Sequence, residues 1–298
     1  MVRRSWMVAL TCGLLSMTFA WGESAAPSSQ PAEAATTEPV SIRQFTLDGP
    51  VVVSVATVDL ASPRVKVVVR RATDVDPDGP GPCITKLDTV RSVASREHLA
   101  VAINGDFFTA PAVRMIFGRR VNYFVGNPAF PVGWMMVDGQ LLHTSTQHPW
   151  AALIRRKNGS ISIAQDCATL PDDAELAVGG SGIVVRDGRV VETNKSPDRA
   201  PRSAVGLSAD GKTMWLVAVD GRRPEYSRGV TMIELGQLMK DLGAATAMNL
   251  DGGGSTTLVA RSGEMYTVLN KPSDGHDLPI PLSVERPVAN VLGVMVDP

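Results

Sequence analysis

Two apolar, strand-like segments flank the sequence Asn249-Leu250-Asp251-Gly252-Gly253-Gly254-Ser255. Ala244 to Met248 precedes it, and Thr256 to Val259 follows it. Three consecutive glycines are unfavourable inside a regular element, so the backbone must turn sharply here or approach a ligand closely. Successive amides in such a turn can bind an anion, and Asp251 beside them can act as a nucleophile, a base or a metal ligand. A tight hairpin whose glycines supply only positive φ explains the pattern equally well.

The chain on either side of this turn predicts many short strands. β-Branched runs at Val51–Val58 and Val65–Val69 predict two strands of one sheet, with Pro63 in the turn between them. Apolar runs at 99–103 and 288–296 predict two more. Asx-Gly pairs between apolar runs predict four hairpins, with turns at Asp138-Gly139, Asn158-Gly159, Asp187-Gly188 and Asp210-Gly211.

Two helices are expected among these strands. Thr231 to Glu234 forms a capping box, which predicts a helix over Met232–Leu242 that Gly243 ends. Lys86–Arg96 has apolar residues on one side and predicts a shorter helix. We therefore predict an α+β fold, with mixed, largely antiparallel sheets packed against a few helices. No linker interrupts residues 41–298, so we expect a single domain there.

The N-terminus has the pattern of a targeting sequence. A basic pair, a short apolar run and the small-residue site Thr18-Phe19-Ala20 predict a signal peptide over residues 1–20. An uncleaved N-terminal anchor is the alternative. Residues 21–40 are rich in Pro, Ala, Ser and Thr and predict a disordered tether. We expect a secreted or periplasmic protein with no membrane span after signal cleavage.

Composition limits the classes of partner and cofactor that we expect for this protein. The 29 basic and 30 acidic residues nearly balance, so nothing favours nucleic acid or an anionic membrane as the main partner. The four histidines are scattered, and CxxC and HExxH are absent, so we expect no metal and no other cofactor. Phosphate sites often recruit divalent cations, but no ligand spacing here argues for one. Whether Cys83 and Cys167 pair is left open, as is the oligomeric state.

Polar side chains of similar chemistry stand at the ends of five predicted strands, where they can converge on one cleft. Glu234 has two interpretations, because a capping-box glutamate needs no further role yet a carboxylate there could also be catalytic. The strand-end residues are Asn104, Asp106, Arg202, Asp220, Arg222, Asn249, Asp251, Glu285, Arg286 and Asn290.

Residues 109–132 form a long irregular segment, and such a segment is more often a lid or binding loop than a spacer.

Five segments, in order along residues 50–298, resemble the motifs of the phosphodiester glycosidase family. Asn104-Gly105-Asp106-Phe107-Phe108 resembles Asn-Gly-Gly-Phe-Phe, with Asp106 in place of a glycine. Arg202 to Gly206 resembles Arg-Thr-Ala-Ile-Gly, with Ser203 in place of threonine. The remaining three resemble Asp-Gly-Arg…Gly-hydrophobic-Thr…Glu-Leu, Asn-Leu-Asp-Gly-Gly-Gly-Ser and the closing motif, and lie at 220–235, 249–255 and 286–290.

The resemblance implies hydrolysis of a sugar C1–O bond whose leaving oxygen belongs to a phosphate. A phosphate monoester has a second pKa near about 6, so it departs without strong protonation. The chemistry then needs an anion cradle and one carboxylate at the anomeric carbon. Asp251 or Glu234 would be that carboxylate, and the cradle and sugar contacts would come from Asn104, Gly105, Asp106, Arg202, Asp220, Arg222, Asn249, Gly252, Gly253, Gly254, Ser255, Arg286 and Asn290.

Two other functions compete with this one. A nucleotide-binding loop at Gly252–Ser255 would need a lysine after the glycines and a following helix, and the sequence has neither. A non-catalytic protein that binds envelope polysaccharide, or assists exopolysaccharide assembly, would also use Asp and Asn side chains in a cleft. The expected partner in both the enzymatic and the binding interpretation is a carbohydrate or sugar phosphate.

Overall fold

The computed structural model describes residues 38–116, 119–144, 151–191, 196–275 and 283–297. The predicted signal peptide and the tether up to residue 37 lie outside the described residues. Residues Glu38–Pro298 form one compact unit. No helix of the described segments is long and apolar enough to cross a membrane.

The predicted α+β class is wrong, because the protein is mostly β. Strands account for 47% of the described residues and helices for 8%. The two predicted α-helices are present, but they cover outer faces of sheets and do not form a layer of the central core. Several strands also escaped prediction.

The largest sheet has seven strands, and every neighbouring pair in it is antiparallel. Its strands in spatial order are β1 (Val40–Leu47), β2 (Val51–Asp59), β18 (Thr213–Val219), β17 (Arg202–Leu207), β19 (Thr246–Asn249), β15 (Gly182–Arg186) and β16 (Arg189–Val190).

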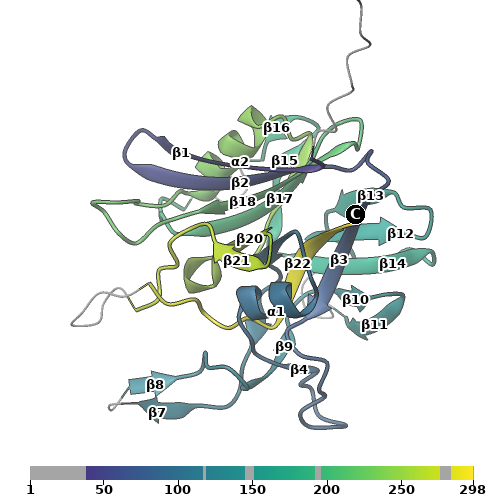
Figure 1. Cartoon of the computed structure of the whole chain (residues 1–298), viewed down its shortest axis with the longest axis vertical. Helices are drawn as coiled ribbons and strands as arrows, with labels where there is room; N and C mark the ends of the chain where they lie inside the picture. The colour runs from purple at the N-terminus through teal and green to yellow at the C-terminus, as the bar shows by residue number, and fades with distance from the viewer. Residues whose placement is uncertain (1–37, 117–118, 145–150, 192–195, 276–282, 298) are drawn as a thin grey trace, which may run out of the picture. The chain divides into compact units, whose positions relative to one another are not determined.

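Two five-stranded antiparallel sheets complete the body of the fold (Figure 1). One consists of β11 (Gln140–His143), β10 (Met135–Val137), β14 (Ala174–Gly180), β12 (Ala151–Arg156) and β13 (Ile161–Ala164). The other consists of β21 (Met265–Val268), β20 (Leu258–Ser262), β5 (Val101–Asn104), β22 (Asn290–Val296) and β3 (Val65–Arg71). Smaller pairings join β4 (Thr85–Lys86), β9 (Pro128–Pro131) and β6 (Phe108–Thr109), and β7 (Arg114–Ile116) with β8 (Arg119–Val121).

The prediction that 51–58 and 65–69 share a sheet is also wrong. β2 is paired on both edges, with β1 on one side and β18 on the other, so it offers no edge to β3. β3 pairs instead with β22 along its full length. The turn near Pro63 therefore carries the chain from one sheet to another.

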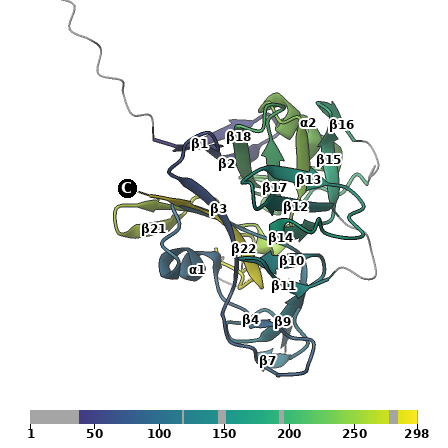
Figure 2. The same ribbon diagram turned by 90° about the vertical axis from the view of Figure 1, so that its right-hand side faces the viewer.

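The central core lies between the three large sheets, all of which contribute buried side chains to it (Figures 1 and 2). Strand periodicity explains the arrangement: in β2, Ala56 and Val58 face this core, whereas Val53 and Val55 face a second cluster. That second cluster packs the large sheet against α2 (Met232–Asp241). A third cluster packs α1 (Val90–Arg96) on β3, β5, β20 and β22.

Both helices begin at side-chain caps. Thr231 and Glu234 form the predicted capping box of α2, and Gly243 after the helix has φ +103°. α1 begins later than predicted, with Thr89 as its N-cap. The reason is that Thr85 and Lys86 pair with β9 and so leave the helical conformation.

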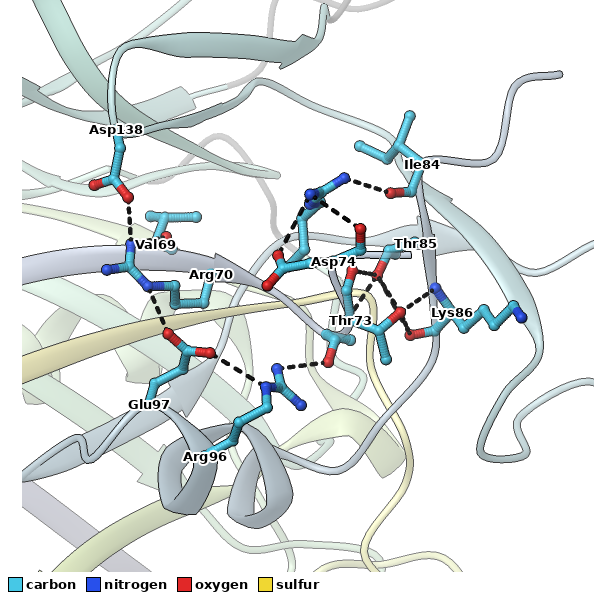
Figure 3. Close-up of polar contacts among 12 residues, drawn as sticks. Val69, Arg70, Thr73, Asp74, Ile84, Thr85, Lys86, Arg96, Glu97 and Asp138 are labelled. Carbon is cyan, nitrogen blue, oxygen red and sulfur yellow. Dashed lines mark hydrogen bonds and ion pairs between the residues drawn. The ribbon is translucent and has the colours of Figure 1, made fainter. Parts of the chain in front are cut away.

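A polar network fastens α1 to the end of β3 (Figure 3). Arg70 lies between two carboxylates, with Nε 3.0 Å from Glu97 and Nη1 3.2 Å from Asp138. Arg96 donates to the carbonyl of Ala72 at 2.9 Å. The contacts of Glu97 and Arg96 position α1, whereas Asp138 connects Arg70 to the turn between β10 and β11.

Candidate active site

Asn104, the last residue of β5, connects three of the predicted strand ends. Its Nδ2 donates to the carbonyl of Asp251 at 2.6 Å. Its Oδ1 accepts from the Ser203 hydroxyl at 2.7 Å and from the Thr257 amide at 3.1 Å. Asn104 is fully buried, and these hydrogen bonds hold the Asp251 turn against β17.

Asn290 and Gly105 form a second connection next to the first. The carbonyl of Gly105 accepts from the Asp251 amide at 3.0 Å, and Asn290 Oδ1 accepts from the Asp106 amide at 2.8 Å. A Cβ on Gly105 would lie 1.9 Å from Asn290 Oδ1. Only glycine at this position lets β22 approach the end of β5, so Gly105 has a packing role.

Asp106 is 1% exposed and lies beneath the site. Its Oδ1 accepts from the Phe107 amide at 2.8 Å and its Oδ2 from the Gly133 amide at 2.5 Å. Burial raises the pKa of Asp106 to about 8 and nearby Asp251 adds to this, although the two amides act in the opposite direction. Asp106 is therefore mostly neutral at pH 7.

Asp251 is the carboxylate of this cluster that stays partly accessible to solvent. Its Oδ1 accepts from the Gly252 amide at 2.8 Å. Burial raises the pKa of Asp251 to about 6, while the nearby Ser255 hydroxyl, Arg286, the Gly252 amide and Arg222 all favour the ionised form. At neutral pH the carboxylate is ionised, with a basicity above that of an ordinary aspartate.

The three glycines bring arginines close to Asp251. Gly253 has φ +61°, and a Cβ there would lie 3.0 Å from Arg222 Nη2. A Cβ on Gly254 would lie 2.2 Å from Arg286 Nη2. The Gly252 amide is used by Asp251, and the Gly253 amide donates to the Pro201 carbonyl at 2.9 Å. These two amides are thus already used, whereas the guanidinium group of Arg222 lies at the turn.

Arg202 and Arg222 form a pair of cations beside the glycine turn. Arg222 is exposed, has an unusual φ of 60°, and within the described segments has no ion-pair partner. Among the described residues, the Arg202 guanidinium makes two long hydrogen bonds, each 3.4 Å, to the carbonyls of Val230 and Asp198. Burial lowers the pKa of Arg202, and the charge of Arg222 lowers it further. Two neighbouring guanidinium groups that repel each other favour an anion between them.

Several other predicted site residues serve the scaffold. Asp220 is 1% exposed and accepts from the Lys271 amide, Asn270 Nδ2 and the Tyr226 hydroxyl at 2.8, 3.1 and 3.0 Å. Asn249 is buried and donates to the Ser181 hydroxyl at 2.8 Å.

Arg286 forms a two-pronged ion pair with Asp274 at 2.7 and 2.8 Å, which largely satisfies its charge. Glu285, a further strand-end residue, accepts from the Arg91 amide of α1 at 2.8 Å.

Glu234 lies apart from this cluster in its contacts. Its carboxylate accepts from the Thr231 amide and pairs with Arg199. It also lines a cavity of about 410 Å³ between β1 and α2, together with Phe45 and Leu238. The contact with the Thr231 amide explains the presence of Glu234 as the capping residue of α2.

Some supporting residues were not singled out from the sequence. Thr257 follows the glycine turn and could have been found as its neighbour, whereas Asn270 and Gly133 lie far along the chain from their carboxylate partners and carry no local signal.

Within the described segments, no group of three or more His, Cys, Asp or Glu side chains is arranged to hold a metal ion. Cys83 and Cys167 are buried and unpaired.

The fold and the cluster define a β-protein in which a partly accessible aspartate and several guanidinium groups meet at one glycine turn. The chain belongs to the phosphodiester glycosidase family, whose family model matches residues 97–295. It is 29% identical over 224 residues to the N-acetylglucosamine-1-phosphodiester alpha-N-acetylglucosaminidase of Bos taurus, and 28% identical to that of Homo sapiens. These alignments cover 69% of this chain but only 39% and 40% of the two relatives.

A solved structure supports the fold. The catalytic domain of zebrafish N-acetylglucosamine-1-phosphodiester alpha-N-acetylglucosaminidase, auto-inhibited by its pro-peptide, superposes with a TM-score of 0.63. The match covers 89% of this chain and 85% of that one, at 22% identity. At this level of identity the likeness establishes the shared fold.

Proposed function

We propose that the protein is a hydrolase that cleaves the C1–O bond of sugar-1-phosphodiesters, with a phosphate monoester as the leaving group. We further propose that it is secreted or periplasmic and acts on phosphate-linked glycans of the cell envelope or related polymers. The observation that carries the proposal is the glycine turn at Gly252–Gly254, where Asp251 lies near the charges of Arg222 and Arg286 and where Arg202 lies next to Arg222.

The roles of these residues follow from their charges. The arginines bind the phosphodiester and stabilise the negative charge that develops on the leaving oxygen. The Asp251 carboxylate attacks the anomeric carbon, or activates a water molecule there, as positive charge builds up on the sugar ring. Little protonation of the leaving group is needed, because a phosphate monoester has a second pKa near about 6. We assign Asn104 to positioning of Asp251 and Glu234 to capping of α2.

The pH dependence follows from the active form of Asp251. Because the ionised form reacts, kcat/KM should rise with pH through about 6, the pKa of this group. A protonated Asp251 acting as a general acid would give the opposite slope. A pH–rate profile of the purified protein distinguishes the two.

The direct test is sugar release from a panel of α-sugar-1-phosphodiesters, with and without a chelator. N-Acetylglucosamine-1-phosphodiesters come first, because the relatives carry that substrate in their names. Asp251→Asn should reduce kcat by at least about 1000-fold, since it removes the reacting group. Glu234→Gln is the matched control and should keep most activity. No release from the whole panel would favour the polysaccharide-binding alternative.

A further inference from the structure

The hairpin formed by β7 and β8 adjoins the site through Tyr123, which follows β8. The guanidinium carbon of Arg286 lies 4.1 Å from the centre of the Tyr123 ring. The same ring meets Phe108, of the Asn104–Phe108 motif, edge-on at 5.7 Å. Tyr123 nevertheless stays 42% exposed. An exposed aromatic ring therefore borders the arginine that lies against Gly254.

The base of the hairpin is fixed to the body of the protein. Asn122 Nδ2 donates to the Ala110 carbonyl at 3.3 Å, and Asn127 Nδ2 donates to the Ala112 carbonyl at 2.9 Å. Among the described strands, β7 and β8 pair only with each other, and Figure 1 shows them extending away from the large sheets. The hairpin thus presents its side chains at a fixed place next to the site.

The charge of this segment departs from that of the chain. Thirty acidic residues in 298 would place about three in a stretch of this length, yet residues 107–137 contain none and carry three arginines. Arg114 and Arg120 are exposed and have no acidic partner among the described residues. Arg114 is held over the Phe124 ring at 3.9 Å. A basic, acid-free surface with exposed aromatic and apolar groups complements a sugar polymer that carries phosphates.

We propose that Arg114, Arg120 and Tyr123 of the β7–β8 hairpin and its base bind the substrate beyond the scissile phosphate, and that this part of the substrate is a polyanionic glycan with further phosphate groups. This inference rests on the proposed function. Tyr123 would stack on a sugar ring next to the cleavage point, while Arg114 and Arg120 pair with phosphates farther along the polymer. The protein then prefers a chain of sugar-phosphate repeats to a single sugar-1-phosphodiester.

The experiment compares kcat/KM for a sugar-phosphate oligomer with that for a one-phosphate diester of the same sugar. The purified protein should prefer the oligomer at 50 mM NaCl, and raising NaCl to 500 mM should remove that preference by screening. The double variant Arg114→Gln/Arg120→Gln should lose about tenfold on the oligomer, mainly through KM, because two exposed charge contacts are removed. Its activity on the one-phosphate diester should stay within about twofold.

The matched control is Arg186→Gln/Arg189→Gln, which removes the same charge from exposed positions on β15 and β16. Equal losses in the two double variants, or no oligomer preference in the unmodified protein, would overturn the inference. Polarisation of a labelled oligomer bound to the Asp251→Asn variant measures the surface without turnover. Oligomer binding without catalysis by the unmodified protein would refute the proposed function alone. If Arg114→Gln/Arg120→Gln left the oligomer affinity unchanged but altered the oligomeric state, the hairpin would be a self-association surface instead.

Discussion

Replacing Asn104 by alanine tests whether one buried amide organises the site. Asn104 contacts the Asp251 carbonyl, the Ser203 hydroxyl and the Thr257 amide at 2.6, 2.7 and 3.1 Å. The substitution leaves all three groups without this hydrogen-bond partner. Each buried group left without a partner costs about 1–3 kcal/mol. Partial relaxation and entry of water reduce the sum, so we expect Asn104→Ala to lower the free energy of unfolding by about 4 kcal/mol.

Urea unfolding at neutral pH gives the magnitude, and a double-mutant cycle gives its origin. Ser203→Ala alone removes one hydrogen bond and should cost about 1 kcal/mol. The double variant Asn104→Ala/Ser203→Ala should lose less stability than the sum of the two single variants, because it no longer contains an unpartnered Ser203 hydroxyl. Catalytic turnover should fall in Asn104→Ala, since the Asp251 turn loses its anchor. A loss of stability below about 1 kcal/mol, or strict additivity in the cycle, would refute this account of the Asn104 contacts.

Three further predictions concern single positions. Asp106→Asn should flatten the pH dependence of the free energy of unfolding. The pKa of Asp106 is raised from 3.8 to about 8 in the folded protein, so its contribution to stability is full below pH 4 and is lost towards pH 8. Urea titrations of the unmodified protein should show this loss as about 1 kcal/mol per pH unit. Glu234→Ala should cost about 1 kcal/mol in thermal unfolding through loss of the capping box, with kcat unchanged. Gly254→Ala should reduce kcat/KM at least about tenfold, because its methyl group would lie 2.1 Å from Asp274 Oδ1 and displace the Arg286–Asp274 pair; unchanged kinetics would contradict the packing argument.

Local chemistry predicted the hairpin turns and the ends of α2 well. Asp138-Gly139 and Asp187-Gly188 both adopt the positive φ values that their sequence indicates. Sheet membership was harder to predict, because it depends on which edges other strands leave free. β3 pairs with β22, more than two hundred residues away, and no pattern within either strand indicates that partner. β14 contains two consecutive glycines and lacks polar alternation, which hides a strand that is paired on both sides.

The sequence located the candidate site better than it assigned roles. Asn104, Asp106 and Asp251, each at the end of a predicted strand, lie close together. Which arginine is free depends on distant residues: Arg286 meets Asp274, whereas Arg222 has no acidic partner within the described segments. In the same way, the carboxylate of Asp220 is satisfied by Asn270 and Lys271, some fifty residues further along the chain.

The protonation state of Asp106 determines the charge that a phosphodiester meets. Arg286 is balanced by Asp274, and the Asp251 carboxylate feels the charges of Arg222 and Asp106. Ionisation of Asp106 near pH 8 therefore makes the net charge of this cluster more negative by one. The KM for a singly charged phosphodiester should therefore rise above pH 8, and Asp106→Asn should keep it level, as initial rates between pH 6 and pH 9 would reveal. A rise of the same size in Asp106→Asn would show that another group, and not this buried carboxyl, controls anion binding.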